Sequence, residues 1–328
     1  MNNTLYPLKF SPIYKTKLWG GNRFKDFFKR ENTPENCGES WEISGVDGNV
    51  SVVCNGFLAD NSLTELLEVY MGDLVGDKVY EKFGNDFPLL IKFIDANDKL
   101  SVQVHPDDKL AEKRHNSFGK TEMWYVLDNE NGAELINGFN KKITKDEYLN
   151  ALESGKLMDI LNSMKVNRGD VFFIPAGRVH AIGKGILIAE IQQTSDITYR
   201  IYDFDRKDKD GKPRELHTEL AVDAIDYNFY KNYRSEYIPK NGESVNAIDC
   251  NYFTTNVLLF DKPIEKDYPE IDSFVIYICT QGKCDVVYGD NNQRESLKAG
   301  ETMLIPAMIK NVALYPSTQT NIVETYIK

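Results

Sequence analysis

Short apolar runs bounded by Gly, Pro, Asn or Asp recur along most of the chain. Runs at 87–93 and 99–104 have the length of single strands, and the segment 253–328 consists almost entirely of such runs. Runs of this length between turn residues are typical of β-strands. None approaches the length of about 18 apolar residues that a membrane-spanning helix needs. The pattern therefore predicts a mainly β protein without a membrane span.

Two segments depart from this pattern because their apolar residues recur at helical spacing. Over 62–83, a serine and a glutamate three residues later form a capping box ahead of the leucines. Over 144–163, Thr144 and Glu147 form a second capping box, and we expect Gly155 to divide that segment into two helices. A few helices should therefore be inserted in the β structure or flank it.

One sequence motif occurs twice. The segment 300–306 (GETMLIP) repeats 169–175 (GDVFFIP) at an offset of 131 residues. Internal repetition of this kind indicates a duplicated structural unit. We expect a catalytic domain over 1–240, which contains the helical segments, and a second β-barrel over 241–328.

The second copy of the motif lacks the polar residues that are candidate metal ligands in the first copy. At the same offset His180 becomes Asn311, and a weaker echo of the strand that begins at Glu122 places Phe274 at the position of this glutamate. The C-terminal barrel is therefore expected to be degenerate and without metal ligands, which leaves one active site per chain.

Four polar side chains of the first copy are arranged like a metal site. Gln103 and His105 are two residues apart in a strand pattern, so their side chains point to the same face. Glu122 begins another strand, and His180 follows a turn that contains Pro and Gly. Two imidazoles, one carboxylate and one amide oxygen suit zinc, although manganese, iron or cobalt also bind such sets. We expect one divalent ion at these residues.

The net charge limits the kinds of ligand that the protein can bind, and the cysteine content indicates its compartment. The net charge is −11 and the pI is about 5.0, and no basic stripe is present that could neutralise nucleic-acid phosphates. A small anionic ligand still fits, because a few local Lys or Arg residues are enough to bind it. Five scattered cysteines form no C-x-x-C pair, and no signal peptide precedes the first strands, so we expect a protein of the reducing cytoplasm.

The motifs resemble those of a known family. The segment 169–180 is similar to the second motif of the cupin superfamily. The segments 88–92 (PLLIK), 103–107 (QVHPD), 120–122 (KTE) and 195–200 (SDITYR) are similar to type I mannose-6-phosphate isomerases in their short bacterial form. The resemblance extends from Trp19 to about Phe204. It implies two cupin (jelly-roll-like) β-barrels with a few helices inserted in or flanking the first.

The resemblance also implies a ligand set and an active site. The zinc ligands of the family match Gln103, His105, Glu122 and His180, which implies one Zn²⁺ per chain. Its active-site arginine matches Arg200, and its Ser-Asp pair brings in Asp196. Its pocket lysines match Lys92 and Lys120, which are suited to the substrate phosphate, with Lys120 also a catalytic candidate.

Other residues complete the expected pocket. Glu42 and Trp19 are further candidates for substrate binding. Asp196, Glu42 and Glu190 all remain candidates for the base that shuttles the proton. Gly119 occupies the place of a histidine in the long forms of the family, so a role of that histidine in ring opening does not transfer to this chain.

The reaction implied by the resemblance is the interconversion of mannose 6-phosphate and fructose 6-phosphate through a cis-enediol. Two alternatives stay open: a sugar-phosphate-binding cupin without catalysis, and a metal-dependent cupin dioxygenase. Action on another hexose phosphate is a closer rival. The expected partner is a small hexose phosphate, with no nucleic acid and no membrane, and the sequence leaves open whether the chain is a monomer or a homodimer.

Overall fold

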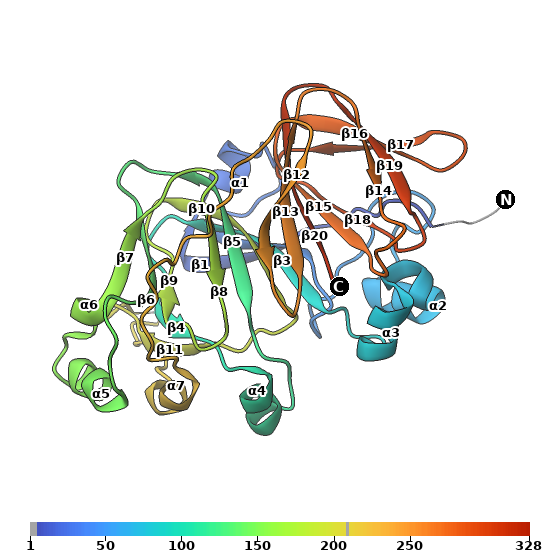
Figure 1. Cartoon of the computed structure of the whole chain (residues 1–328). Coiled ribbons are helices and arrows are strands. Elements are labelled where there is room, and N and C mark those ends of the chain that lie inside the picture. The colour runs from blue at the N-terminus through green and yellow to red at the C-terminus, as the bar shows by residue number, and fades with distance from the viewer. Residues whose placement is uncertain (1–4, 208–209) are drawn as a thin grey trace. The chain divides into compact units, whose positions relative to one another are not determined.

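A computed structural model describes residues 5–207 and 210–328 and shows a chain built mainly of β-strands (Figure 1). It divides into two compact units. Unit 1 comprises Met1–Ile13, Trp41–Ile91 and Glu236–Lys328, and unit 2 comprises Tyr14–Ser40 and Lys92–Ser235. The division falls within three strands, β1 (Ile13–Gly21), β2 (Cys37–Ile43) and β3 (Leu89–Ala96).

Unit 2 is built on two sheets. The strands of the first follow the order β1 (Ile13–Gly21), β2 (Cys37–Ile43), β3 (Leu89–Ala96), β10 (Ile186–Gln193), β5 (Glu122–Asn129) and β8 (Val171–Ile174). Those of the second follow the order β11 (Tyr199–Tyr202), β4 (Val102–Val104), β9 (His180–Ala181), β6 (Glu134–Phe139) and β7 (Leu161–Lys165). The pairs β10–β5, β5–β8, β11–β4 and β4–β9 are antiparallel.

Unit 1 repeats this plan. One sheet follows the order β12 (Ser244–Asp249), β13 (Thr254–Phe260), β20 (Thr320–Tyr326), β15 (Val275–Gln281) and β18 (Thr302–Ile305). The other follows the order β14 (Ile264–Asp267), β19 (Asn311–Pro316), β16 (Lys283–Tyr288) and β17 (Gln293–Lys298). Two antiparallel sheets in each unit are typical of jelly-roll-like barrels. The predicted fold class is confirmed.

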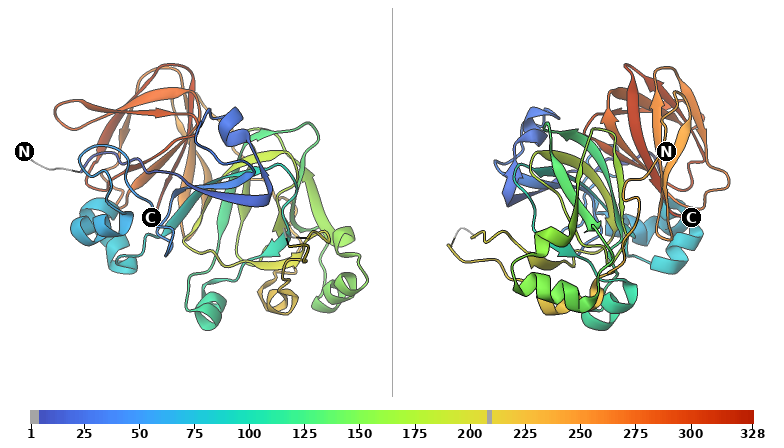
Figure 2. Two further views of the ribbon diagram at one scale, coloured as in Figure 1. Left: turned by 180° about the vertical axis from the view of Figure 1, so that it is seen from behind. Right: turned by 60° about the vertical axis from the view of Figure 1, so that its left-hand side comes forward.

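Seven helices are found among the described residues: α1 (Arg23–Asp26), α2 (Leu63–Val75), α3 (Asp77–Phe83), α4 (Asp108–His115), α5 (Lys145–Glu153), α6 (Leu157–Ile160) and α7 (Thr218–Ala224). Both predicted capping boxes are present, at Ser62 and at Thr144. Figures 1 and 2 show α4, α5 and α7 at the same end of the unit 2 sheets. The predicted extent of the second helical segment was wrong, because Leu161–Lys165 pairs with β6 as strand β7.

The compact units group the N-terminal helices differently from the expected division at residue 240. Helices α2 and α3 belong to unit 1, where Ala307 N donates to Leu74 O over 2.9 Å and the carboxylate of Asp272 accepts from the first backbone amides of α3. The ring of Phe87 lies 4.8 Å from that of Phe274. These contacts explain why 41–91 clusters with the C-terminal residues. The functional division into a catalytic and a degenerate domain remains a prediction.

Strand alternation determines which side chains of β4 face which core. Val102 and Val104 lie in one hydrophobic cluster of unit 2, together with Phe139 and Tyr199. Because neighbouring residues of a strand point to opposite faces, Gln103 faces away from this cluster. The second cluster of unit 2, around Trp124 and Phe172, includes residues of β5 and β8. The polar site therefore lies on the face of β4 opposite to Val102 and Val104.

Strand pairing corrects one detail of the predicted repeat. In unit 2, Glu122 pairs with Ile174, and in unit 1 the residue at the 131-residue offset, Ile305, pairs with Val275. The position of Glu122 is thus taken by Val275, not by Phe274. The predicted alignment, which placed Phe274 at the position of Glu122, was therefore wrong by one residue. Asn311, at the offset position of His180, is exposed.

The corrected register reveals a buried carboxylate in each barrel. Glu190 pairs with Trp124, and Glu324 pairs with Tyr277, which occupies the equivalent place in unit 1. Glu324 is 1% exposed and accepts hydrogen bonds from Tyr268 and Asn256, with Lys266 Nζ 3.0 Å away. The carboxylate of unit 1 is therefore fully engaged by neighbouring side chains.

No helix within 5–207 and 210–328 combines the length and the apolar character needed to cross a membrane. All five cysteines have free thiols.

The hydroxyl of Tyr148 on α5 yields a stability prediction. The side chain is fully buried, and its Oη has no hydrogen-bond partner among the described residues. A buried polar group without a partner costs about 1–3 kcal/mol. We expect Tyr148→Phe to leave the free energy of unfolding unchanged or to raise it by about 1 kcal/mol, measured by urea denaturation.

A matched control is Tyr268→Phe, at a tyrosine that is 4% exposed. Its hydroxyl donates to Glu324 over 2.6 Å and also contacts the Tyr277 hydroxyl, so its removal leaves a buried carboxylate short of a donor. This variant should lose about 1–3 kcal/mol. Equal losses in the two variants would contradict the different environments of the two hydroxyls.

Candidate metal centre and active site

Three side chains from separate strands of unit 2 converge in a buried cluster. One potential ligand atom each from His105, Glu122 and His180 lies within 4.8 Å of the other two. The three residues are at most 1% exposed. His105 Nε2 and His180 Nε2 each lie 3.5 Å from a different oxygen of Glu122. The carboxylate is thus flanked by both imidazoles.

Backbone hydrogen bonds hold these strands together around the cluster. Gly177 N donates to His105 O over 2.9 Å, and Lys120 N donates to Pro106 O over 3.1 Å. Gly177 has a φ of +85°, and a Cβ there would lie 2.9 Å from the carbonyl oxygen of Ala224. The turn that delivers His180 therefore requires glycine at this position.

The two imidazoles have the geometry of metal ligands with fixed tautomers. Each Nδ1 contacts a backbone carbonyl, Ile197 O at 2.9 Å for His105 and Arg178 O at 2.8 Å for His180. An Nδ1–H donated to a carbonyl leaves the Nε2 lone pair directed at Glu122. Burial lowers the pKa of both histidines, and for His105 the nearby Lys120 lowers it further. These shifts favour the neutral ring, the form that binds a metal.

The donor set fits a divalent cation. His105 Nε2 and both carboxylate oxygens of Glu122 are buried without a hydrogen-bond partner in the described part of the chain. Gln103 pairs directly with His180 across β4 and β9, and its Nε2 lies 3.2 Å from His180 Nε2. Rotation of this amide would present its oxygen instead. Unpartnered buried acceptors of this kind are costly, and a bound cation would satisfy them.

Two lysines and a second glutamate adjoin the cluster. Lys120 Nζ lies 3.6 Å from Glu122 Oε2, and Lys92 Nζ lies 3.3 Å from Glu190 Oε1. Trp124 Nε1 donates to the other oxygen of Glu190 over 3.0 Å. Both lysines are 5% exposed and Glu190 is 4% exposed. Two positive and two negative side chains are thus buried together.

The pKa values of these groups follow from burial and mutual charge. Burial, and next to it Glu122, raises the pKa of Glu190. Burial and the charge of Lys92 lower the pKa of Lys120. Burial alone would lower the pKa of Lys92, but Glu190 and other carboxylates raise it above the usual value. The carboxyl group of Glu190 and the ammonium group of Lys120 thus both have pKa values shifted toward neutrality. Proton-transfer sites require such shifts.

The other predicted site residues occupy different environments. Arg200 pairs directly with Gln103 across β11 and β4, so both side chains lie on one face of the sheet. Asp196 is exposed in the loop before β11. Trp19 is buried in the hydrophobic cluster around Trp124, where it packs as a core residue. Glu42 is buried on β2, in unit 1.

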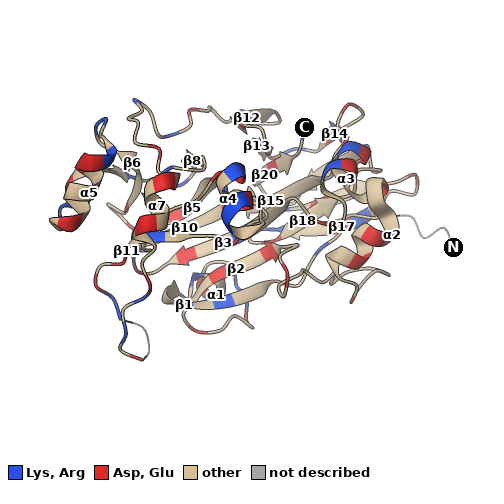
Figure 3. Ribbon diagram, turned by 90° about the horizontal axis from the view of Figure 1, so that it is seen from below, with Lys and Arg blue, Asp and Glu red and all other residues tan. Residues whose placement is uncertain are grey.

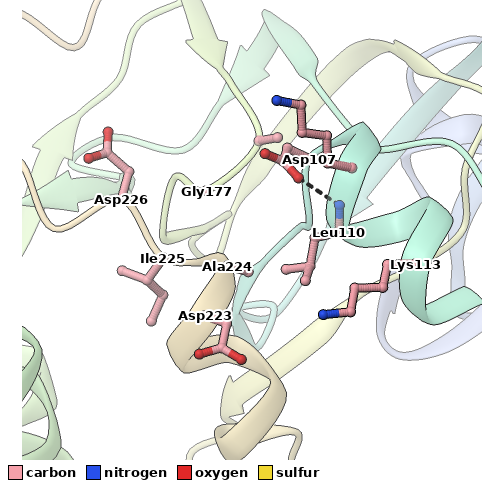
Figure 4. A pocket seen from close by; sticks show the side chains of 10 residues that line it. Asp107, Leu110, Lys113, Gly177, Asp223, Ala224, Ile225 and Asp226 are labelled. Atoms are coloured by element: carbon pink, nitrogen blue, oxygen red, sulfur yellow. Dashed lines mark hydrogen bonds between the residues drawn. The ribbon is translucent and has the colours of Figure 1, made fainter.

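The aspartate of the QVHPD segment has a structural explanation. Asp107 accepts from Leu110 N over 2.9 Å and caps α4 directly after the strand that bears His105 (Figure 4). A cavity of about 470 Å³ lies beside this cap and is lined by residues of α4, by the Ala176–Gly177 turn and by the end of α7. The lining combines Lys113 with aspartates such as Asp223 (Figure 4).

A group of charged residues that begins after β11 was not predicted from the sequence. Asp203 is 5% exposed and accepts hydrogen bonds from both Arg206 and Arg214. These residues lie in the charged segment between β11 and α7. Its spacing could not show that two of its arginines meet at one aspartate.

Comparison with known proteins identifies one family. The family described as "Phosphomannose isomerase type I, catalytic domain" matches residues 7–141. Mannose-6-phosphate isomerase from Streptococcus mutans is 36% identical over 93% of this chain and 94% of its own length, and ManA, a mannose-6-phosphate isomerase from Bacillus subtilis, is 36% identical over 92% and 94%.

Solved structures give the same result. The crystal structure of the mannose 6-phosphate isomerase from Bacillus subtilis matches 98% of this chain and 99% of its own, with a TM-score of 0.87 and 32% identity. A phosphomannose isomerase variant from Salmonella typhimurium has a TM-score of 0.80 at 17% identity, which shows a shared fold. Identity above 30% over nearly the full length of both chains establishes that this chain belongs to the type I mannose-6-phosphate isomerase family.

Proposed function

We propose that this protein interconverts mannose 6-phosphate and fructose 6-phosphate through a cis-enediol, with one Zn²⁺ held by Gln103, His105, Glu122 and His180. The observation that carries the proposal is the buried cluster of unpartnered ligand atoms beside two lysines, in a chain of this family. A divalent cation bound there would act as a Lewis acid toward the negative charge that develops on the substrate oxygens.

Glu190 is the best candidate for the group that moves the proton between C1 and C2. Its pKa is raised by burial and by Glu122, so it exchanges a proton closer to neutral pH than an exposed carboxylate does. Trp124 and Lys92 fix its two oxygens. Asp196 is exposed, which makes it a poorer candidate.

The two lysines are suited to the charge that forms during the reaction. Lys120 and Lys92 lie within 3.6 Å and 3.3 Å of the glutamates of the site, and both are almost fully buried. An ammonium group in such a low-dielectric site stabilises an enediolate oxygen more strongly than it would in water. Arg200, on the same face as Gln103, would orient the substrate from the neighbouring strand.

Metal binding is tested first. We expect Zn²⁺ at 100 times its dissociation constant to stabilise the wild-type protein by about 2.7 kcal/mol, seen as a rise in melting temperature. His180→Ala should fold, lose the bound metal and show no such rise. His115→Ala is the control, because this exposed histidine contacts Tyr199 and lies outside the cluster. An equal response of His180→Ala and wild type to Zn²⁺ would refute the ligand assignment.

Catalysis is tested with a coupled assay on mannose 6-phosphate. We expect turnover that a chelator abolishes and Zn²⁺ restores. Glu190→Gln should lower kcat by about 10²–10⁴-fold while the metal content is retained, because the amide cannot exchange the proton.

Each alternative gives a different result in this assay. Binding of fructose 6-phosphate without any turnover would indicate a sugar-phosphate-binding protein, and oxygen uptake would indicate a dioxygenase. Full turnover of Glu190→Gln would remove Glu190 from the proton transfer.

A further inference from the structure

The substrate phosphate needs a binding site at some distance from the reacting carbons. In a hexose 6-phosphate the phosphate is attached at C6, which about four carbon–carbon bonds of about 1.5 Å each separate from C2. Lys120 and Lys92 lie directly against the carboxylates Glu122 and Glu190, in the same buried cluster as the histidines. Cations so close to the proposed metal are placed for the chemistry at C1 and C2, which leaves the phosphate to other groups.

Three arginines lie further along β11 and in the loop that follows it. Arg200 pairs with Gln103, and Asp203 comes three residues later, about 10 Å along an extended chain. Arg206 donates to Asp203 Oδ1, and Arg214 donates to both oxygens of Asp203. Figure 3 shows the segment that follows β11 with blue and red positions close together.

The group carries an excess of positive charge. Three guanidinium groups, of Arg200, Arg206 and Arg214, act on one another and on two carboxylates, of Asp203 and Glu215, which leaves a formal charge of +1. A phosphate monoester carries about −1.5 to −2 at neutral pH. A purely structural ion pair would need one arginine for this aspartate, whereas two arginines share it. Asp203 therefore does not neutralise the charge of both guanidinium groups.

The geometry and the burial of the three arginines also favour an anion-binding site. Arg200 Nη1 donates to Glu215 O over 2.8 Å, while its Nε is buried and has no hydrogen-bond partner within the described ranges. Burial and then Arg214 lower the pKa of Arg200, the effect expected of a cation crowded by another cation. Arg206 and Arg214 are 15% and 21% exposed, and Arg206 also donates to the carbonyl oxygens of Asp203 and Lys99, so an anion would bind beside these acceptors.

Resting on the proposed function, we infer that Arg206 and Arg214, oriented by Asp203 and acting with Arg200, bind the phosphate group of the hexose phosphate. Arginine forks are suited to phosphate oxygens because they donate in pairs. The substrate would then extend along β11, with its phosphate at the base of the charged loop and its C1–C2 end at the histidine cluster.

The test compares the zinc-loaded wild-type enzyme with Arg206→Gln, Arg214→Gln and the double variant. A hydrogen bond to a charged group contributes about 1.5–3 kcal/mol, so each single variant should raise KM for mannose 6-phosphate and the inhibition constant of inorganic phosphate by about 10–100-fold. The fall in kcat should be much smaller. The ratio of kcat/KM for mannose 6-phosphate to that for free mannose should fall in parallel, a change that a structural defect alone would not produce.

Arg114→Gln is the matched control. Its guanidinium donates to Asp223 over 2.6 Å and is 21% exposed, the same as Arg214, but it lies on α4 outside the arginine group. It should leave KM and phosphate inhibition unaltered. Wild-type values of KM and of phosphate inhibition in the double variant would overturn the inference, as would equal losses on mannose and its phosphate.

Two further outcomes separate this inference from neighbouring ones. A rise in KM with little loss of kcat in Lys92→Gln, together with wild-type behaviour of the arginine variants, would place the phosphate at the lysines instead. If the wild-type enzyme does not isomerise mannose 6-phosphate, the proposed function fails. Calorimetric titration with inorganic phosphate then still decides the arginine site, because weaker binding by the double variant supports it and equal binding refutes it.

Discussion

A carboxylate buried without hydrogen bonds is the constraint on which the site depends. Glu122 is fully buried between two imidazoles, and neither of its oxygens has a hydrogen-bond partner among the described residues. Burial of a charge in this state is expensive unless an opposite charge compensates it. Lys120 is near, but at 3.6 Å it makes no hydrogen bond. The neutral imidazoles and the fixed tautomers are consistent with a cation as the missing partner.

The two barrels show what this constraint changes. Both contain a buried glutamate at the same register position, Glu190 in unit 2 and Glu324 in unit 1. Glu324 is satisfied by a tyrosine, an asparagine and a lysine, and Val275 replaces the glutamate that would bind a metal. The same fold thus contains a hydrogen-bonded glutamate in unit 1 and a set of ligand atoms without hydrogen-bond partners in the described part of unit 2. The difference arises from a few side chains on equivalent strands.

The sequence predicted the cluster because its members come with local signals. Gln103 and His105 are spaced for one face of a strand, and His180 follows a turn that only glycine allows. The capping boxes at Ser62 and Thr144 are likewise local, and both were found. Periodicity did not separate helix from strand at Leu161–Lys165, because a short apolar run fits both and pairing with β6 decides. The arginine group could not be predicted, since it forms only when the loop after β11 brings Arg206 and Arg214 to Asp203.

The most direct test of the central claim is anomalous diffraction at the zinc edge from crystals of the zinc-loaded protein. The account predicts one anomalous peak in unit 2, about 2.0–2.2 Å from the Nε2 atoms of His105 and His180 and from an oxygen of Glu122, with the Gln103 amide oxygen turned toward it. A peak at other residues, or Glu122 hydrogen-bonded to Lys120 with no peak beside it, would contradict the account.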